Sequence, residues 1–353
     1  MSRRGYLDWL RGVAVIIMIE AHTLDAWTRG ADRSGAFRWA MVVAGYGAPF
    51  FMFLAGIGLS LAAGSRQRKG TSDDKVAARG RLRGAQILGL AFLFRAQSWL
   101  VSGGSMRSIL KVDILNVMGL SMLAAALIWG WGRSRLSRAG GLVLATLVCT
   151  MVTPIVRDTA LLDTWPSPLV SYLRPIPGRA TFTLFPWAGF LLAGAAVGLW
   201  LDSVRSADGE RRVILSLGGI GIALGFGGYL ASYLPTIYSH SEYWTSSPTY
   251  FFVRLGVLVL ALPVALVWSA AWKGWSPLQT FGRSSLFVYW VHVELVYGVI
   301  STSLHRALTF ESAIVGFVLF TIFMFLLAMA KDRVIARWRG APTMTSGEFS
   351  TAS

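Results

Sequence analysis

Residues 7–27 read LDWLRGVAVIIMIEAHTLDAW, a hydrophobic run long enough to span a membrane that also carries ionisable groups. In an α-helix the eleven steps from Arg11 to His22 return almost to the starting angle, at about 100° per residue. Both side chains then share one face, about 16 Å apart along the axis, with Asp8 and Asp25 within about 60° of it. Such charges are costly against lipid, so this face is expected to line a protein interior or a water-filled cavity. It therefore marks a candidate functional site.

The composition indicates a membrane protein. The chain has 353 residues, 54% of them hydrophobic, and a mean hydropathy of +0.56. Its apolar runs are too long and too many for a soluble protein, and they are continuous rather than alternating, which argues against a β-barrel. We expect an all-α, polytopic integral membrane protein with about ten transmembrane helices. The expected spans are 6–27, 40–63, 84–101, 109–131, 140–156, 183–201, 213–234, 250–271, 284–301 and 310–330.

The distribution of positive charge predicts the orientation. With ten spans, 21 of the 33 Lys and Arg residues fall on the side of the two termini and 8 on the other side. This bias places both termini in the cytoplasm of a multi-pass protein of the inner cell membrane. Residues 1–335 are expected to form one integral membrane domain, and residues 336–353 a disordered cytoplasmic tail. The net charge of +16 is assigned to topology rather than to nucleic acid, because no nucleic-acid recognition module accompanies it.

Further polar residues inside or at the ends of the later spans are candidates for binding. Ser285, Tyr289 and His292 share one helix face by their spacing. Each candidate also has an ordinary structural interpretation: Lys111 and Arg254 lie near span ends, where long side chains reach the headgroups, and a lone histidine can bond a neighbouring helix. The candidate binding residues are Asp8, Arg95, Lys111, Asp113, Arg254, Ser285, Tyr289 and His292.

Several kinds of site are not indicated. The four histidines show no metal-ligand spacing and the chain has no cysteine pair, so no metal site is expected. The single Cys149 also excludes an intrachain disulfide. The sequence has no phosphate-binding glycine loop of the Walker type and no serine nucleophile elbow. The glycines of the second and seventh spans indicate close helix packing instead.

The motifs resemble those of membrane acyltransferases. LDWLRG followed by an apolar run and EAH resembles the Arg-x10-His first span shared by acyltransferase family 3 and the family named for the catalytic domain of heparan-alpha-glucosaminide N-acetyltransferase. Four further segments are similar to segments of the latter family: APFFMFLAGIGLSLAAG, ILKVDILNVMGLSMLAAALIW, FTLFPWAGFLLAGAAVGLWL and SSPTYFFVRLGVLVL. FGRSSLFVYWVHVEL resembles a span common to both groups. The likeness covers most of the chain.

The resemblance implies transfer of an acyl group from a cytoplasmic acyl-CoA, with acetyl-CoA as the expected co-substrate, to an extracytoplasmic glycan hydroxyl or amine. It implies His22 as the active histidine and Arg11 as its motif partner. In lysosomal members the essential histidine lies in the loop after the first span, whereas this chain has no histidine between His22 and His240. The mechanism therefore fits the Arg-x10-His pattern better, and the lysosomal substrate is not carried over.

The chemistry of such a transfer suits these residues. A histidine can act as the base that deprotonates the acceptor or as the carrier of the acyl group. Asp25, three residues after His22, is positioned to hold the ring in one tautomer, and Arg11 to bind the CoA pyrophosphate. The expected partners are the lipid bilayer, acyl-CoA and a carbohydrate or other envelope acceptor; the oligomeric state is not indicated. The alternatives are a transporter or flippase with a buried charge relay, and a non-catalytic accessory subunit of envelope assembly.

Overall fold

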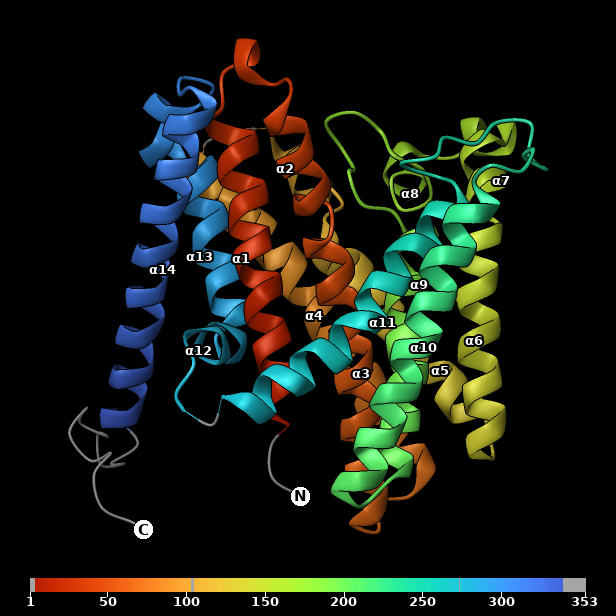
Figure 1. Ribbon diagram of the computed structural model, residues 1–353. Coiled ribbons are helices and arrows are strands. Elements are labelled where there is room, and N and C mark those ends of the chain that lie inside the picture. Colours follow the sequence, from red (N-terminus) through yellow and green to blue (C-terminus); the bar gives the residue numbers. More distant parts are fainter. Residues whose placement is uncertain (1–3, 103–104, 273, 339–353) are drawn as a thin grey trace. The chain divides into compact units, whose positions relative to one another are not determined.

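The computed structural model describes residues 4–102, 105–272 and 274–338. Over these ranges the regular elements are α-helices and short 3-10 helices, with isolated β-bridges and no strand (Figure 1). The all-α fold predicted from the sequence is therefore confirmed.

The elements follow one another along the chain with short connections, except between α8 and α9 and between α10 and α11. They are α1 (Gly5–Trp27), η1 (Gly30–Asp32), α2 (Ala36–Ala44), α3 (Gly47–Arg68), α4 (Asp73–Ser102), η2 (Met106–Leu110), α5 (Ile114–Trp131), α6 (Arg135–Met151), α7 (Thr153–Asp158), η3 (Ala160–Thr164), α8 (Ser167–Val170), α9 (Leu184–Ser203), α10 (Ala207–Ala231), α11 (Pro248–Ala271), α12 (Pro277–Arg283), α13 (Ser285–Tyr297), η4 (Val299–Leu304) and α14 (Phe310–Trp338).

The contacts divide the chain into two compact units. The first consists of Met1–Ala44 and Gly274–Ser353, so it joins α1 and α2 to the last helices of the chain. The second consists of Gly45–Lys273 and contains α3 to α11. The single domain predicted over 1–335 stays a prediction. Of the predicted tail, residues 336–338 belong to α14, and 339–353 lie outside the described residues.

Two glycines bring α1 and α12 into backbone contact in the first unit. A Cβ placed on Gly12 would lie 1.9 Å from the carbonyl oxygen of Leu278 in α12. A Cβ placed on Gly282 would lie 1.9 Å from the carbonyl oxygen of Asp8 in α1. A glycine on each helix therefore removes the side chain that would hold the two backbones apart. The LDWLRG and FGRSSL segments, far apart in the sequence, meet at this point.

The second unit uses the same kind of packing between α3 and α9. A Cβ on Gly56 would lie 1.9 Å from the carbonyl oxygen of Leu191, and one on Gly194 would lie 2.0 Å from that of Phe53. The expectation that glycines of the second span form a packing surface is confirmed at Gly56. Both contacts bury large apolar side chains around them, Phe53 and Leu191 among them.

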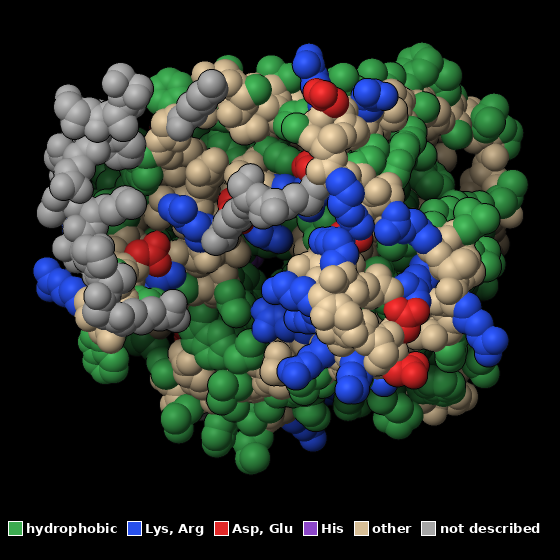
Figure 2. Space-filling view, turned by 90° about the horizontal axis from the view of Figure 1, so that it is seen from below, with side chains coloured by type: hydrophobic (Ala, Val, Ile, Leu, Met, Phe, Trp, Pro, Cys, Tyr) green, Lys and Arg blue, Asp and Glu red, His purple; other side chains and the backbone are tan. Residues whose placement is uncertain are grey.

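One end of the second unit is rich in cations. Exposed Lys and Arg side chains occupy the turns that join α3 to α4, α5 to α6 and α9 to α10, and they gather on the face shown in Figure 2. Two acidic residues at this end are paired: Asp202, 3% exposed, lies 2.5 Å from Arg68, and Asp73 lies 2.5 Å from Arg138. An excess of Lys and Arg is typical of the cytoplasmic side of a membrane protein. The orientation with this end in the cytoplasm stays a prediction.

A helix lies at each of the ten predicted spans. Within the described part of the chain, six segments are long and apolar enough to cross a membrane. Helix α1 is as long as these but carries more charge, including Asp8, Arg11 and Glu20, and is not one of the six. The count of about ten crossings therefore stays a prediction. The six segments are Ala36–Arg68, Ile114–Trp131, Leu184–Ser203, Ala207–Ala231, Pro248–Ala271 and Phe310–Trp338.

We expect Gly12→Ala to lower the stability of the first unit strongly, because the new methyl group would collide with backbone rather than with a movable side chain. Overpacking typically costs about 1–3 kcal/mol, and contact with backbone places this variant at the upper end of that range or above it. Thermal unfolding of the purified protein in detergent measures the effect. Gly30→Ala is the matched control, since no described atom lies within 4 Å of the position its Cβ would take. Equal unfolding temperatures for the two variants would contradict the close contact of α1 with α12.

Candidate active site

The side chains of His22 on α1 and His292 on α13 are hydrogen-bonded in the first unit. Nδ1 of His22 lies 2.7 Å from Nε2 of His292. The ring planes differ by 4° and the centroids are 5.0 Å apart. That separation is close to the hydrogen-bond length plus one ring radius at each end, so the rings lie nearly in one plane, edge to edge. The face predicted to carry Arg11 and His22 thus turns toward α12 and α13.

The tautomer of each ring follows from the hydrogen-bond partners. Nδ1 of His292 lies 2.8 Å from the carbonyl oxygen of Val288, and a carbonyl only accepts, so this nitrogen carries the proton. In the neutral ring Nε2 of His292 is then an acceptor, and Nδ1 of His22 must donate to it. The neutral pair therefore leaves the lone pair of His22 on Nε2. One backbone carbonyl fixes which nitrogen of His22 is basic.

Burial distinguishes the two rings. The side chain of His292 is fully buried, with 0% exposure, whereas His22 is only partly buried. The ring of Tyr297 approaches His22 edge-on at 5.5 Å between centroids, and Tyr289 approaches His292 edge-on at 6.0 Å. One tyrosine ring thus packs against each histidine, and His22 is the more exposed member of the pair. Sequence spacing grouped Tyr289 with His292, but it missed Tyr297, which lies off that helical face.

Asp25 does not hold the ring of His22 as the sequence predicted. Its Oδ1 lies 3.0 Å from Nη1 of Arg33, and the same guanidinium donates to the Asp25 backbone carbonyl. The partner of His22 Nδ1 is His292 instead. The reason is the loop after α1, which folds back and brings Arg33 beside the end of the helix. The spacing of the first span alone gives no signal for this contact.

Arg11 lies about three turns before His22 on the same uninterrupted helix, about 16 Å along its axis. Its Nη1 donates to Oδ1 of Asp8 at 3.0 Å, and the Arg11 side chain remains 30% exposed while that of Asp8 is 6% exposed. The buried carboxylate therefore holds the guanidinium and leaves part of it accessible. A short distance from this pair, Gly282 of α12 packs on the same stretch of α1.

The start of α13 is held by a residue that the sequence analysis did not select. Nζ of Lys331 on α14 donates to Oγ of Ser284 at 2.7 Å. Ser284 is buried and immediately precedes Ser285, the residue predicted for the site, which is the first residue of α13. Lys331 also lies 2.9 Å from Asp332 and 5.4 Å from the centroid of the Phe287 ring. These contacts join α14 to the junction between α12 and α13.

The other predicted binding residues lie in the second unit. Nε of Arg95 on α4 lies 3.2 Å from Oδ2 of Asp113, which caps the first turn of α5. Lys111 lies close to them, at a pocket that Arg95 also lines. Arg254 on α11 is not at this pocket; its guanidinium lies over the ring of Tyr250, at 4.3 Å from the centroid.

Among the residues whose positions are described, no three His, Cys, Asp or Glu side chains are grouped so that they could hold a metal ion. The first unit offers a histidine that can act as a base or nucleophile and, on the same helix, an arginine held by a carboxylate.

Part of the chain is similar to a known protein family. A family model described as heparan-alpha-glucosaminide N-acetyltransferase, catalytic, matches residues 3–219. The match includes Arg11, His22, Arg95, Lys111 and Asp113, and it ends before α13. Among curated proteins, no significant match to the chain is found. The pairing of His292 with His22 thus comes from the structure alone.

We expect nuclear magnetic resonance of protein labelled with 15N-histidine to show His22 with a protonated Nδ1 and a bare Nε2. A coupling through the hydrogen bond should connect Nδ1 of His22 to Nε2 of His292. The chain has only four histidines, so the spectrum can be assigned by single substitutions, with His240→Ala as a control outside the pair. A proton on Nε2 of His22 would contradict the assigned tautomer.

Proposed function

Because the chain belongs to the heparan-alpha-glucosaminide N-acetyltransferase catalytic family, whose members are membrane acetyltransferases, we propose that it transfers an acetyl or other acyl group from cytoplasmic acyl-CoA to an extracytoplasmic acceptor. The acceptor is a hydroxyl or amine of a glycan or another envelope component. The observation that carries this proposal is the His22–His292 hydrogen bond, which leaves a basic nitrogen on the accessible ring.

In direct transfer, Nε2 of His22 removes the proton of the acceptor O–H or N–H as that atom attacks the thioester carbonyl. The bond from carbon to sulfur then breaks, and CoA leaves as the thiolate, which takes up the proton. In the two-step alternative, Nε2 attacks the carbonyl itself, the bond from carbon to sulfur breaks, and CoA leaves as the thiolate. The acceptor O–H or N–H then attacks the acyl carbon, the bond from carbon to Nε2 breaks, and the proton that the acceptor loses balances the one that the thiolate takes up. Both routes need the lone pair on Nε2, and in both His22 becomes positively charged. His292 accepts a hydrogen bond from Nδ1 and stabilises that charge.

Arg11 is proposed to act on the donor. A guanidinium binds phosphate oxygens in pairs, and the exposed part of Arg11 is available for the pyrophosphate of acyl-CoA. The buried Asp8 carboxylate holds the Arg11 side chain in place and so lowers the cost of ordering it. The separation of about 16 Å along α1 is comparable to the length of an extended pantetheine arm. This arm would carry the thioester from Arg11 toward His22.

The proposed orientation gives the reaction its direction. We take the chain to cross the inner membrane about ten times with both termini in the cytoplasm, as the bias of Lys and Arg supports. Helix α1 then starts at the cytoplasmic side, so Arg11 faces the donor compartment and His22 lies in the outer part of the helix. The acyl group crosses the membrane along α1 while the phosphates of CoA stay on the cytoplasmic side.

Turnover of labelled acetyl-CoA by the purified protein tests this function. We expect label to appear in an added glycan or envelope fraction and His22→Ala to lower the rate about 10²- to 10⁴-fold, the usual contribution of a general base. Arg11→Gln should raise the KM for acetyl-CoA more than it lowers kcat, because it removes binding of the donor.

The control for these variants is His240→Ala. The His240 ring is exposed and lies in the loop between α10 and α11, beside Asp158. It should leave turnover unchanged. Full activity of His22→Ala would overturn the role given to that residue. Movement of a substrate across vesicles without CoA consumption would support a transporter or flippase instead, and an accessory subunit would show neither reaction.

A further inference from the structure

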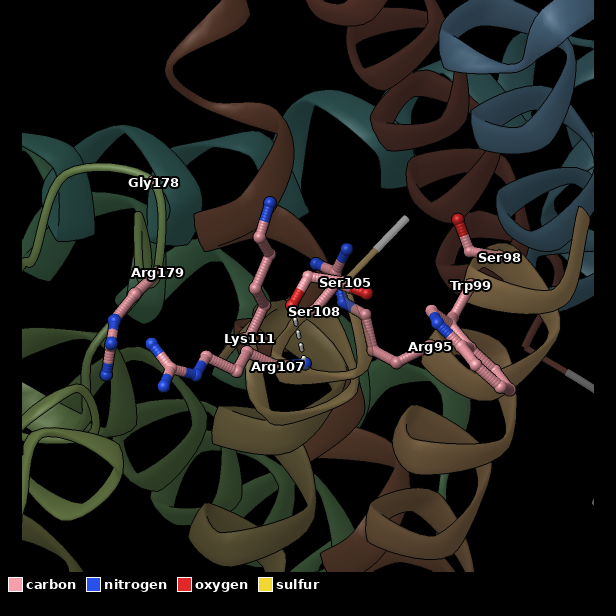
Figure 3. Close-up of a pocket in the computed structure, with 9 residues that line it drawn as sticks. All are labelled: Arg95, Ser98, Trp99, Ser105, Arg107, Ser108, Lys111, Gly178 and Arg179. Atoms are coloured by element: carbon pink, nitrogen blue, oxygen red, sulfur yellow. Dashed lines mark hydrogen bonds between the residues drawn. The ribbon is translucent and has the colours of Figure 1, made fainter. Parts of the chain in front are cut away.

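A pocket in the second unit is lined by cations from three separate segments. Its volume is about 520 Å³, and its walls include Arg95 from α4, Arg107 from η2, Lys111 and Arg179 (Figure 3). Figure 3 shows Arg107 and Arg179 on one side, Arg95 with Trp99 on the other, and Lys111 between them. A neighbouring hollow of about 320 Å³ shares Arg107 and Arg179 and adds the hydroxyl-bearing Ser167 and Ser171.

The charges in this pocket are poorly compensated. No acidic side chain is part of its lining. Asp113 is the one carboxylate paired with a lining cation in the described contacts, and it pairs with Arg95. Arg179 donates to the neutral Ser167 hydroxyl. Four cations with one carboxylate leave an excess of positive charge, which an anion of more than one charge neutralises best.

The walls of the pocket are held by backbone contacts. The backbone N–H of Val112 donates to the carbonyl of Arg179 at 2.9 Å, which ties the turn at 176–180 to the residue after Lys111. Asp113 caps α5 by accepting from the N–H groups of Leu115 at 3.0 Å and Asn116 at 3.2 Å. The segments that carry the cations are therefore fixed before any ligand arrives, which lowers the entropic cost of binding.

The position of the pocket separates it from the donor. Helix α4 begins at the cation-rich end with Asp73 and reaches the pocket at Arg95, Ser98 and Trp99. In the predicted span 84–101, Ser98 lies 14 residues, or about 21 Å of helix, beyond the cytoplasmic end, which is the outer third of a bilayer core about 30 Å thick. In the proposed orientation the pocket opens on the non-cytoplasmic side. The CoA phosphates are then on the other side of the membrane and are not its ligand.

We propose that this pocket binds a phosphate or pyrophosphate group on the non-cytoplasmic side, carried either by the acceptor or by a lipid headgroup. Arginine guanidinium groups match phosphate oxygens in pairs, and several cations around one site favour a dianion over a monoanionic carboxylate. The volume is typical of a site for a small ligand, and the Trp99 ring offers a flat surface for the apolar or sugar part of the molecule. The pocket itself is independent of acyl transfer; only its link to the acceptor rests on the proposed function.

Isothermal titration of the full chain in maltoside detergent, which contains no phosphate, tests the site with inorganic pyrophosphate as the probe. We expect saturable binding that the double variant Arg107→Gln/Lys111→Gln weakens at least tenfold. The control is Arg211→Gln/Arg212→Gln, which removes the same charge from exposed positions at the cation-rich end. Equal weakening by both double variants, or no saturable binding by the wild type, would overturn the proposal.

Competition identifies the chemistry and the source of the phosphate. Displacement of pyrophosphate by short-chain phosphatidic acid more strongly than by a soluble sugar phosphate supports a lipid source, and the reverse order supports the acceptor. Displacement by a hexuronate as strongly as by a phosphate would overturn the phosphate assignment. His22→Ala should bind pyrophosphate like the wild type. Loss of acyl transfer with pyrophosphate binding intact therefore bears on the proposed function and leaves the pocket standing.

Discussion

The close approach of α1 to α12 is the contact on which the candidate active site depends. Gly12 and Gly282 allow backbone to meet backbone, so α13, which follows α12 after one residue, runs beside the C-terminal part of α1. His292 can reach His22 only because this approach sets the distance between the helices. Backbone contacts after α13 extend the arrangement, since Leu308 donates to the Trp27 carbonyl at 3.0 Å and Arg306 to that of Ala26 at 2.9 Å. The first and last parts of the chain thus form one site-bearing unit.

The buried ionisable groups discussed above avoid the cost of burial in two ways. Buried carboxylates such as Asp8, Asp113 and Asp202 have an arginine partner, which offsets the cost of removing a charge from water. The His22–His292 pair avoids that cost by being satisfied in its neutral form, with a carbonyl at one end and a free lone pair at the other. The cations around Lys111 outnumber the one carboxylate paired with them, and they line a pocket, so they form a candidate anion site.

Much of this arrangement could be predicted from local sequence. Helical periodicity placed Arg11 and His22 on one face, and hydropathy located the helices. Local sequence could not identify the partner of His22, because the hydrogen bond joins residues 270 positions apart and depends on how two helices dock. Asp25 was assigned to the wrong partner because a loop residue, Arg33, folds back on it. Arg107 and Arg179 were missed for a similar reason: they come from a 3-10 helix and a turn, which have no periodic pattern.

Family membership makes the chain a membrane acetyltransferase, and we propose that His22 and His292 act in it as one unit. A double-mutant cycle on acetyl transfer measures this most directly. If His292 acts only through His22, the variant carrying both His22→Ala and His292→Ala will be no slower than His22→Ala alone, although His292→Ala by itself lowers the rate. Losses that multiply in the double variant, with all variants folded by thermal unfolding, would contradict the account.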